Sequence, residues 1–221
     1  MNEMLPIKRS KTRARRFYDR ISGIYDTLTS SEKALIKQGV ELIAVQPGEH
    51  VLEIGCGTGS ALKFILDSDL NPAGVIGLDL SRKMLLQSQK KNSQVEPPPL
   101  HIQGDGVHLP LLNNSLDVVF ISFTLELFSK ADLTKVLGEC HRVLKSKGRL
   151  GVVSLASTPR TLPLKIYELA HQLFPVAVDC RPIPLVELLE ANGFETITAK
   201  KHRNWGLPIH LTLSRKHDNN I

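Results

Sequence analysis

The sequence predicts an α/β protein in which helices cover both faces of a largely parallel sheet, giving a three-layer sandwich. Short β-branched runs alternate with longer helical patterns through the middle of the chain, as in strands joined by crossover helices. The run "LDVVFISF", residues 116–123, is almost continuously apolar, as expected of a central strand buried on both faces. Residues 50–65 place three glycines between an apolar run and an amphipathic run, and this cluster needs a structural reason.

The first part of the sheet is expected to alternate strand and helix. Ser81 has the position of an N-cap residue for the helix that follows the second strand. Gly148 is a stop signal for the helix that precedes the fifth strand. We expect strands at residues 50–55, 74–80, 100–104, 116–123 and 149–154, with helices at 58–67, after Ser81, and at 131–144.

The last third of the chain has a different pattern. A helix is expected at 161–173, followed by a Pro-interrupted segment at 174–184 and a helix at 184–192 that ends before Gly193. Two β-like runs, 194–200 and 207–214, are separated only by the short junction "HRNWG". They are predicted to pair as an antiparallel hairpin at one edge of the sheet. No repeat or linker divides the chain, so one folded domain is expected.

Composition favours an ordinary globular protein. The 221 residues are 42% hydrophobic and 23% charged, and no apolar stretch reaches the roughly 18 residues of a membrane span. The N-terminus lacks the apolar core of a signal peptide. Three widely spaced cysteines indicate neither a disulfide framework nor a zinc knuckle, and the eight histidines lack metal-ligand spacing. A cytoplasmic protein without a metal is the expectation.

The net charge of +6 is concentrated at the N-terminus. Residues 1–20 hold seven basic and two acidic side chains, so they carry +5 of that charge. A solvated, partly disordered tail is the simplest interpretation. Contact of residues 8–20 with an anionic membrane is a second, because clustered cations gain about 1 kcal/mol each near such a surface. Specific nucleic-acid binding is not expected without interleaved aromatic residues, and an Arg-rich mitochondrial presequence stays open.

The glycine cluster predicts a ligand site at the carboxyl edge of the sheet, where open α/β sheets bind ligands. Gly55, Gly57 and Gly59 would let the backbone pass beneath a ligand, with their N–H groups directed at its oxygens. Asp79 ends the second strand, where a carboxylate can accept hydrogen bonds from both ribose hydroxyls. Ser60 stands where a dinucleotide fingerprint has its last glycine, and Glu53 would repel a pyrophosphate but accept from an amine. These features favour S-adenosylmethionine over a nicotinamide dinucleotide.

Five motifs in consistent order carry a family resemblance. They are "VLEIGCGTG", "GLDLS", "GDGVHLPL", "LDVVFISFTLELF" and "RVLKSKGRLGVVSL", preceded by "FYDRISGIYD". Together they resemble class I S-adenosylmethionine-dependent methyltransferases, and most closely the ubiquinone/menaquinone-biosynthesis branch (methyltransferase type 11), over about residues 17–155. The resemblance implies a Rossmann-like seven-stranded sheet with an antiparallel last strand. It also implies a basic, cofactor-covering segment at residues 1–30 and a methyltransferase domain at residues 31–221.

The same resemblance implies roles for individual residues. Glu53 and the loop backbone would hold the methionine moiety, and Asp79 the ribose, while Asp105 would accept from the adenine amino group. Cys56 is expected only to fill space in the loop. The complete set of implied cofactor-binding residues is Tyr18, Tyr25, Glu53, Gly55, Cys56, Gly57, Gly59, Asp79, Leu80, Met84, Asp105, Gly106, Ser122 and Phe123.

The catalytic residues are left open by the sequence. Glu126 follows the fourth strand and either faces the substrate mouth or is a solvated acid. His171, Arg181 and His210 lie in the final third, where acceptor pockets often form, and a structural role is the simpler interpretation of each. Glu126, His171 and His210 are therefore only weak candidates for a general base.

The acceptor and oligomeric state are also open. The branch carries an Arg-Asn pair after the fourth strand, whereas this chain reads "SFTLELF". A quinone-type ring, a phospholipid headgroup and a small soluble acceptor are therefore all retained. Two other classes stay as alternatives, namely a nicotinamide-dependent oxidoreductase and a non-catalytic module that binds S-adenosylmethionine.

Overall fold

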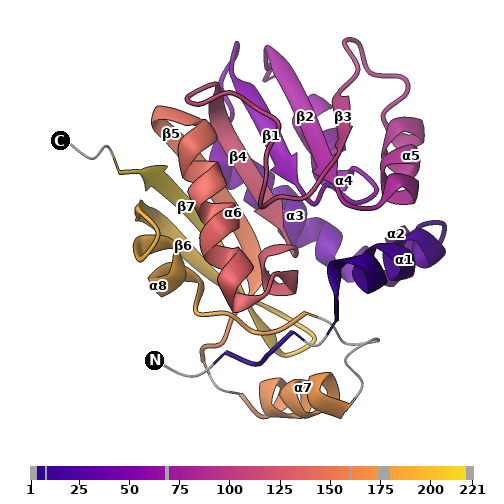
Figure 1. The fold of residues 1–221 in the computed structure, drawn as a ribbon, viewed down its shortest axis with the longest axis vertical. Coiled ribbons are helices and arrows are strands. Elements are labelled where there is room, and N and C mark those ends of the chain that lie inside the picture. Colours follow the sequence, from indigo (N-terminus) through magenta and orange to yellow (C-terminus); the bar gives the residue numbers. More distant parts are fainter. Residues whose placement is uncertain (1–3, 8, 68–69, 160, 174–179, 218–221) are drawn as a thin grey trace.

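A seven-stranded sheet forms the centre of the molecule (Figure 1). The structure is a computed structural model that describes residues 4–7, 9–67, 70–159, 161–173 and 180–217. The strand order is β3-β2-β1-β4-β5-β7-β6. Strands β1 to β5 pair in parallel, and β7 runs antiparallel to both of its neighbours. The predicted α/β class, the antiparallel last strand and the edge hairpin are confirmed. The strands are β1 (His50–Ile54), β2 (Gly74–Asp79), β3 (Leu100–Gln103), β4 (Leu116–Ser122), β5 (Leu144–Leu155), β6 (Phe194–Asn204) and β7 (Leu207–Lys216).

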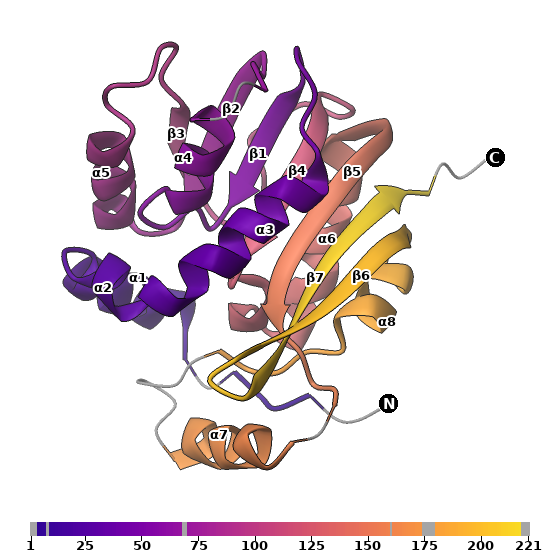
Figure 2. The same ribbon diagram turned by 180° about the vertical axis from the view of Figure 1, so that it is seen from behind.

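Helices cover the two faces of the sheet, as Figures 1 and 2 show from opposite sides. One apolar cluster packs α3, α4 and α5 against one face, and a second packs α6 and α8 against the other. Val118, Val119, Phe120 and Ile121 of β4 are all fully buried, which confirms the predicted central strand. The helices are α1 (Lys11–Ile21), α2 (Tyr25–Leu28), α3 (Lys33–Ile43), α4 (Ser60–Leu66), α5 (Arg82–Lys91), α6 (Lys130–Val143), α7 (Leu162–Leu173) and α8 (Leu185–Glu190), with single 3₁₀ turns η1 (Ser30–Glu32) and η2 (Leu125–Leu127).

The connection between α6 and β5 differs from the prediction. Gly148 does not precede the strand, because β5 begins at Leu144, directly after the last residue of α6. Leu144 pairs with Leu116, and the next pair is Arg149 with Val118. The intervening residues of β5 form a bulge that includes Lys147 with a positive φ of 63°. The Pro-interrupted segment predicted at 174–184 lies in part outside the described residues.

The basic N-terminal segment includes a helix, α1, which is preceded by described residues that are not helical. Ser10 caps α1 by accepting a hydrogen bond from the backbone N–H of Arg13 (3.4 Å). Asp19 accepts from the hydroxyl of Ser81 (2.7 Å) and from the backbone N–H of Lys83 (3.2 Å) at the start of α5. Helix α1 is thereby held at the carboxyl edge of β2. Within the described residues, every helix is too short or too polar to cross a bilayer.

Two glycines allow α3 to lie close to the sheet. A methyl group added at Gly39 would overlap Val153 and approach Phe120, and one added at Gly151 would overlap Ile43. This close approach packs the second half of α3 on the sheet, and the N-terminal end of α3 lines the ligand cavity described below.

Replacing Gly39 by alanine should therefore lower the free energy of unfolding by about 1–3 kcal/mol, because overpacking outweighs the gain in helix propensity. Gly138 in α6 is the matched control, since no atom lies within 4 Å of a methyl group added there. Gly138→Ala should stabilise the protein by up to about 1 kcal/mol. Urea unfolding of both variants measures the difference. A stabilised Gly39→Ala variant would show that α3 is not tightly packed on β4 and β5.

Candidate functional site

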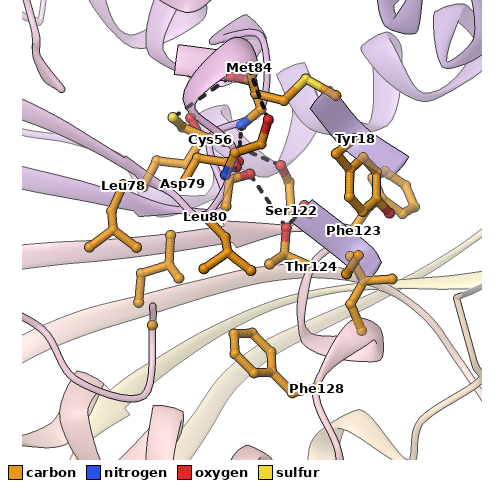
Figure 3. A pocket seen from close by; sticks show the side chains of 18 of the residues that line it. Tyr18, Cys56, Leu78, Asp79, Leu80, Met84, Ser122, Phe123, Thr124 and Phe128 are labelled. Atoms are coloured by element: carbon orange, nitrogen blue, oxygen red, sulfur yellow. Dashed lines mark hydrogen bonds between the residues drawn. The ribbon is translucent and has the colours of Figure 1, made fainter. Parts of the chain in front are cut away.

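A cavity of about 380 Å³ opens at the carboxyl ends of β1, β2 and β4, within the size range of small-molecule sites. Tyr18 of α1 lies on its other side (Figure 3), where the N-terminal segment also lines the cavity. Thirteen of the fourteen residues predicted to bind a cofactor line this cavity. These are Tyr18, Tyr25, Glu53, Gly55, Cys56, Gly57, Asp79, Leu80, Met84, Asp105, Gly106, Ser122 and Phe123.

The glycine loop connects β1 to α4, and the backbone N–H groups of its glycines donate to other groups of the protein. The N–H of Gly55 donates to the carbonyl of Leu78 (2.7 Å), and that of Gly59 to the carbonyl of Cys56 (2.8 Å). The N–H of Gly57 donates to the Asp79 carboxylate (2.9 Å). The prediction that these three N–H groups point at ligand oxygens is therefore wrong.

Glycine is needed at the three positions of this loop for different structural reasons. All have positive φ, at 71° for Gly55, 53° for Gly57 and 77° for Gly59, a conformation that glycine adopts without steric cost. A methyl group on Gly57 would have only Tyr25 near it, at 3.9 Å, so this glycine borders open space. A methyl group on Gly59 would overlap Ser88 of α5. Gly59 is thus a helix-packing residue, and it is not among the residues that line the cavity.

Asp79 holds the loop to the end of β2. Its carboxylate accepts from the N–H of Gly57 and from the N–H of Ser81 (2.7 Å). Burial raises the pKa of Asp79 to about 6. Each carboxylate oxygen has a second lone pair, so Asp79 can position the loop and still accept hydrogen bonds from a ligand.

Glu53, near the end of β1, is a buried polar group that lines the cavity. The side chain is 1% exposed. The hydroxyl of Ser122 donates to Oε1 (3.3 Å). No described donor has hydrogen-bond geometry to Oε2, although the backbone N–H of Leu62, at the start of α4, favours the ionised form of the carboxyl. Burial raises the pKa of Glu53 to about 8. A buried acceptor without a donor costs free energy, and a cationic amine in the cavity would remove that cost.

The β2 and β3 side of the cavity combines apolar and polar contacts. Leu80 follows β2, and Met84 of α5 is 1% exposed. Asp105 is engaged by the protein itself, because Lys11 of α1 donates to its Oδ2 (2.7 Å). Gly106 lies against Ile54, where a methyl group would approach within 2.9 Å. Asp105 therefore anchors α1 over the cavity, a contact that its predicted role as an adenine acceptor did not anticipate.

The N-terminal helices are joined to the glycine loop by a second network. Asp26 accepts a hydrogen bond from the hydroxyl of Thr58 and forms an ion pair with Lys91 of α5 (2.7 Å). Tyr25 packs edge-to-face on Tyr18, with their ring centroids 6.1 Å apart. Both tyrosines line the cavity, so the N-terminal segment closes one side of it.

The three weak catalytic candidates lie outside the cavity lining. Glu126 is fully buried and accepts from the hydroxyl of Ser154 (3.1 Å) and the N–H of Leu155 (3.2 Å). The prediction of a solvated acid is therefore wrong, and Glu126 is not among the residues that line the cavity. His171 and His210 are buried in α7 and β7.

Arg181 has a structural role that the sequence did not specify. It is 1% exposed and donates to the backbone carbonyls of Leu5 (2.7 Å) and Phe128 (2.6 Å). The N-terminal segment is therefore held to η2 by this arginine.

Glu32 is a titratable cavity residue that was not predicted from the sequence. It ends η1 and lines the cavity, and no described group donates a hydrogen bond to its carboxyl. Burial raises the pKa of Glu32 to about 7. The local sequence "SSEK" resembles an exposed helix start, so only the tertiary fold reveals its burial.

Cys56 has the space-filling role that the sequence predicted. Its side chain packs on β2, where a methyl group added at Gly77 would come within 2.9 Å of the sulfur. Burial raises the pKa of the Cys56 thiol well above its ordinary value, which keeps it in its unreactive form.

The fold and the cavity define a Rossmann-like protein for a ligand that joins a nucleoside to an amine. Asp79 has the place of a ribose acceptor, and the unsatisfied Glu53 carboxyl disfavours a diphosphate. Among the described residues, no cluster of histidine, cysteine or acidic side chains is arranged to hold a metal ion.

Comparisons with known proteins agree with this class. A family model described as a methyltransferase domain matches residues 51–148. The demethylmenaquinone methyltransferase of Lactobacillus johnsonii is 30% identical over 93% of this chain and 91% of that protein. The demethylmenaquinone methyltransferase of Thermotoga maritima is 36% identical, but the match spans only 63% of its length. The fold is similar to that of magnesium protoporphyrin IX methyltransferase from Synechocystis with bound SAH, with a TM-score of 0.73, 19% identity, and coverage of 94% of this chain and 100% of that one.

The chain belongs to the class I S-adenosylmethionine-dependent methyltransferases, and its cofactor is S-adenosylmethionine. The predicted family resemblance is confirmed, and the alternative of a nicotinamide-dependent oxidoreductase is wrong.

The buried Glu53 carboxyl gives a pH-dependent stability that can be measured without a ligand. Its pKa rises from 4.5 to about 8 on folding, so between these values the folded state holds a proton that the unfolded state has lost. Stability therefore falls as pH rises through this window. Glu53→Gln should remove this loss and raise stability at pH 8.5 relative to wild type by at least about 1 kcal/mol, or about 2–4 °C in Tm. Thermal unfolding at pH 5.5 and 8.5 tests this, and an identical pH dependence in both proteins would contradict it.

Proposed function

We propose that this methyltransferase transfers the methyl group of S-adenosylmethionine to a lipophilic, hydroquinone-type ring. The observation that carries the cofactor placement is the Oε2 atom of Glu53, a buried acceptor without a donor in the described structure. An α-ammonium group would supply the missing donor. The acceptor class is supported by the L. johnsonii relative, whose name specifies demethylmenaquinone.

Strand order arranges the proposed contacts in a row. From β2 through β1 to β4, the cavity presents Asp79, then Glu53, then Phe123. We assign the ribose to Asp79, the adenine to the pocket beside Leu80 and Met84, and the amino acid to Glu53. The methyl group would then face the β4 side. Tyr18 and Tyr25 would cover the cofactor, so residues 1–30 would act as its covering segment.

The acceptor is assigned to the β4 and α3 side of the cavity. This wall is built mainly by the apolar side chains of Ile36, Phe123 and Leu127, with the carboxyl of Glu32 among them. Phe123 has a positive φ of 46°, uncommon for a bulky residue, which sets its ring at the end of β4. An apolar wall that carries a carboxyl group suits a planar ring that bears a hydroxyl group.

S-adenosylmethionine supplies an electrophilic methyl group on a sulfonium sulfur when it is bound. The walls of the cavity would align the acceptor carbon with it, and such positioning can contribute roughly 7–11 kcal/mol to rate enhancement. Glu32, in its ionised form, would accept the proton of the ring hydroxyl and increase the electron density of the ring. The ring carbon would then bond to the methyl group as the sulfur–methyl bond breaks and S-adenosylhomocysteine is released. That carbon would lose its own proton to solvent as the ring becomes aromatic again. A pKa of about 7 suits a general base near neutral pH.

Cofactor binding should depend on Glu53 and not on buried carboxyls elsewhere. Glu53→Gln should raise the Kd for S-adenosylhomocysteine at least about tenfold, equivalent to about 1.4 kcal/mol, because the amide loses the charge that pairs with the ammonium. Glu126→Gln is the matched control, since Glu126 is equally buried but lies outside the cavity. Isothermal titration calorimetry measures both constants. Equal affinities in the two variants would remove Glu53 from the cofactor site.

Glu32→Gln should separate binding from chemistry. We expect kcat at pH 7.5 to fall about 100-fold, within the range for a general base, with the Kd for S-adenosylhomocysteine unchanged. The wild-type rate should rise with pH through about 7, as Glu32 ionises, and the variant should lose this rise. An unaltered pH profile in the variant would show that Glu32 is not the base.

The acceptor class can be tested directly with labelled S-adenosylmethionine. We expect label in a desmethyl naphthohydroquinone, and not in phosphatidylethanolamine or in a soluble catechol. Label in phosphatidylethanolamine alone would favour a phospholipid headgroup, and label in the catechol alone a small soluble acceptor. Binding of S-adenosylhomocysteine without turnover of any acceptor would support a non-catalytic module.

A further inference from the structure

Helix α7 exposes a continuous apolar stripe. Leu162, Ile166, Leu169 and Leu173 are 70%, 60%, 56% and 63% exposed, and their spacing of four, three and four residues places them on one helix face. The opposite face is also largely apolar and packs on the body, with Leu164 fully buried and His171 4% exposed. A helix that is apolar on both sides is normally covered on both. The exposed stripe therefore calls for an external contact.

The tip of the β6–β7 hairpin extends this surface. Trp205, at the turn, is 84% exposed and has a positive φ of 52°, which is a costly conformation for a bulky residue. The hydroxyl of Thr161 donates to the carbonyl of Gly206 (3.5 Å), and a methyl group on Gly206 would lie 3.0 Å from Pro163. The tryptophan and the start of α7 are therefore neighbours.

This apolar surface adjoins the acceptor side of the cavity. Figures 1 and 2 show α7 and the hairpin tip at the end of the molecule toward which β1, β2 and β4 point. Asn204, beside Trp205, donates to the hydroxyl of Ser31 (3.2 Å). The next residue, Glu32, lines the cavity. A molecule that enters from this surface would thus meet the wall assigned to the acceptor.

Positive charge surrounds the exposed apolar side chains. Residues 196–217 contain five lysines and arginines and no acidic residue. Three of these cations, Lys200, Lys201 and Arg203, are exposed within five residues of Trp205. On α7, Lys165 is exposed and the acidic Glu168 is half-buried, so the excess of positive charge comes from the hairpin. Exposed leucines and a tryptophan bordered by cations are the pattern of a segment that lies in the interface of an anionic bilayer.

We propose that the α7–hairpin surface, defined as the exposed stripe of α7 together with Trp205, docks on an anionic lipid bilayer. The apolar side chains would enter the headgroup region while the neighbouring cations pair with lipid phosphates. This surface differs from residues 8–20, which the sequence suggested for the same contact. In that segment Lys11 forms ion pairs with Asp105 and Asp132, and Arg9 lies over the ring of Phe17 at 4.8 Å.

Trp205 is the single tryptophan of the chain, so its fluorescence reports on this surface in the unmodified protein. Vesicles of phosphatidylglycerol and phosphatidylcholine should shift its emission to shorter wavelength, and brominated acyl chains should quench it. Pure phosphatidylcholine vesicles should bind at least about tenfold more weakly, because the electrostatic attraction is lost. An unchanged spectrum with the anionic vesicles would overturn the proposal.

Two double variants separate this surface from general hydrophobicity. Leu162→Ser/Leu169→Ser should weaken partition into anionic vesicles at least about tenfold in co-sedimentation. Leu86→Ser/Leu112→Ser removes two leucines that are 52% and 80% exposed elsewhere, and it should bind vesicles like wild type. Equal loss in both variants, or no loss in either, would contradict a specific docking surface.

A second copy of the chain as the partner of the α7–hairpin surface, and the proposed methyl transfer, are tested in separate experiments. Sedimentation velocity without lipid should show a monomer, and a dimer abolished by Leu162→Ser/Leu169→Ser would instead assign the surface to a second copy of the chain. The idea that docking delivers a lipid-dissolved acceptor rests on the proposed function. The α7 variant should therefore keep wild-type turnover of a short-chain, soluble naphthohydroquinone while losing turnover of a vesicle-bound one. Vesicle binding with no turnover of either would leave docking intact and overturn only the proposed acceptor.

Discussion

The structure depends on one constraint at the end of β1, where the chain must turn sharply while a carboxyl group stays buried. Glu53 is the last but one residue of that strand, and one of its oxygens has no donor in the described structure. The hydrogen bond from the Gly57 N–H to Asp79 keeps the following turn folded back on β2. Because hydrogen bonds within the protein hold this turn, the Glu53 carboxyl keeps one orientation in the cavity. The buried carboxyl thus lowers the stability of the free protein, and in return the binding site for the amine is formed before the cofactor binds.

Much of the fold could be predicted because its signals are local. The apolar run of β4, the glycine turn and the final hairpin are each specified by a few neighbouring residues, and thirteen of the predicted ligand residues meet in one cavity. The packing role of Gly59 was not predicted, because it depends on a contact between two helices. A side chain at this position would overlap Ser88 of α5. Glu126 and Glu32 were misjudged or missed for a related reason, since burial of a carboxyl depends on elements distant in sequence. The bulge that starts β5 likewise arises from pairing with β4.

The N-terminal segment makes contacts that its charge alone does not predict. Its basic residues suggested a solvated or membrane-bound tail, yet Lys11 reaches Asp105 and Asp26 reaches Lys91. Both contacts join the segment to the walls of the cofactor cavity. The surface with the stronger pattern for lipid is instead formed by α7 and the hairpin tip, where apolar and basic side chains occur together. The cofactor would thus be covered by the N-terminal segment, and a lipophilic acceptor would enter the same cavity from the side of α7 and the hairpin tip.

The most direct test of the central claim is a carbon-13 NMR titration of the Glu53 side-chain carboxyl, with and without S-adenosylhomocysteine. In the free protein its pKa should lie near 8, as burial requires. Binding should lower this pKa by at least about one unit, because a neighbouring ammonium group favours the ionised carboxylate. A carboxyl pKa that stays the same on binding would contradict the placement of the ligand's amine at Glu53.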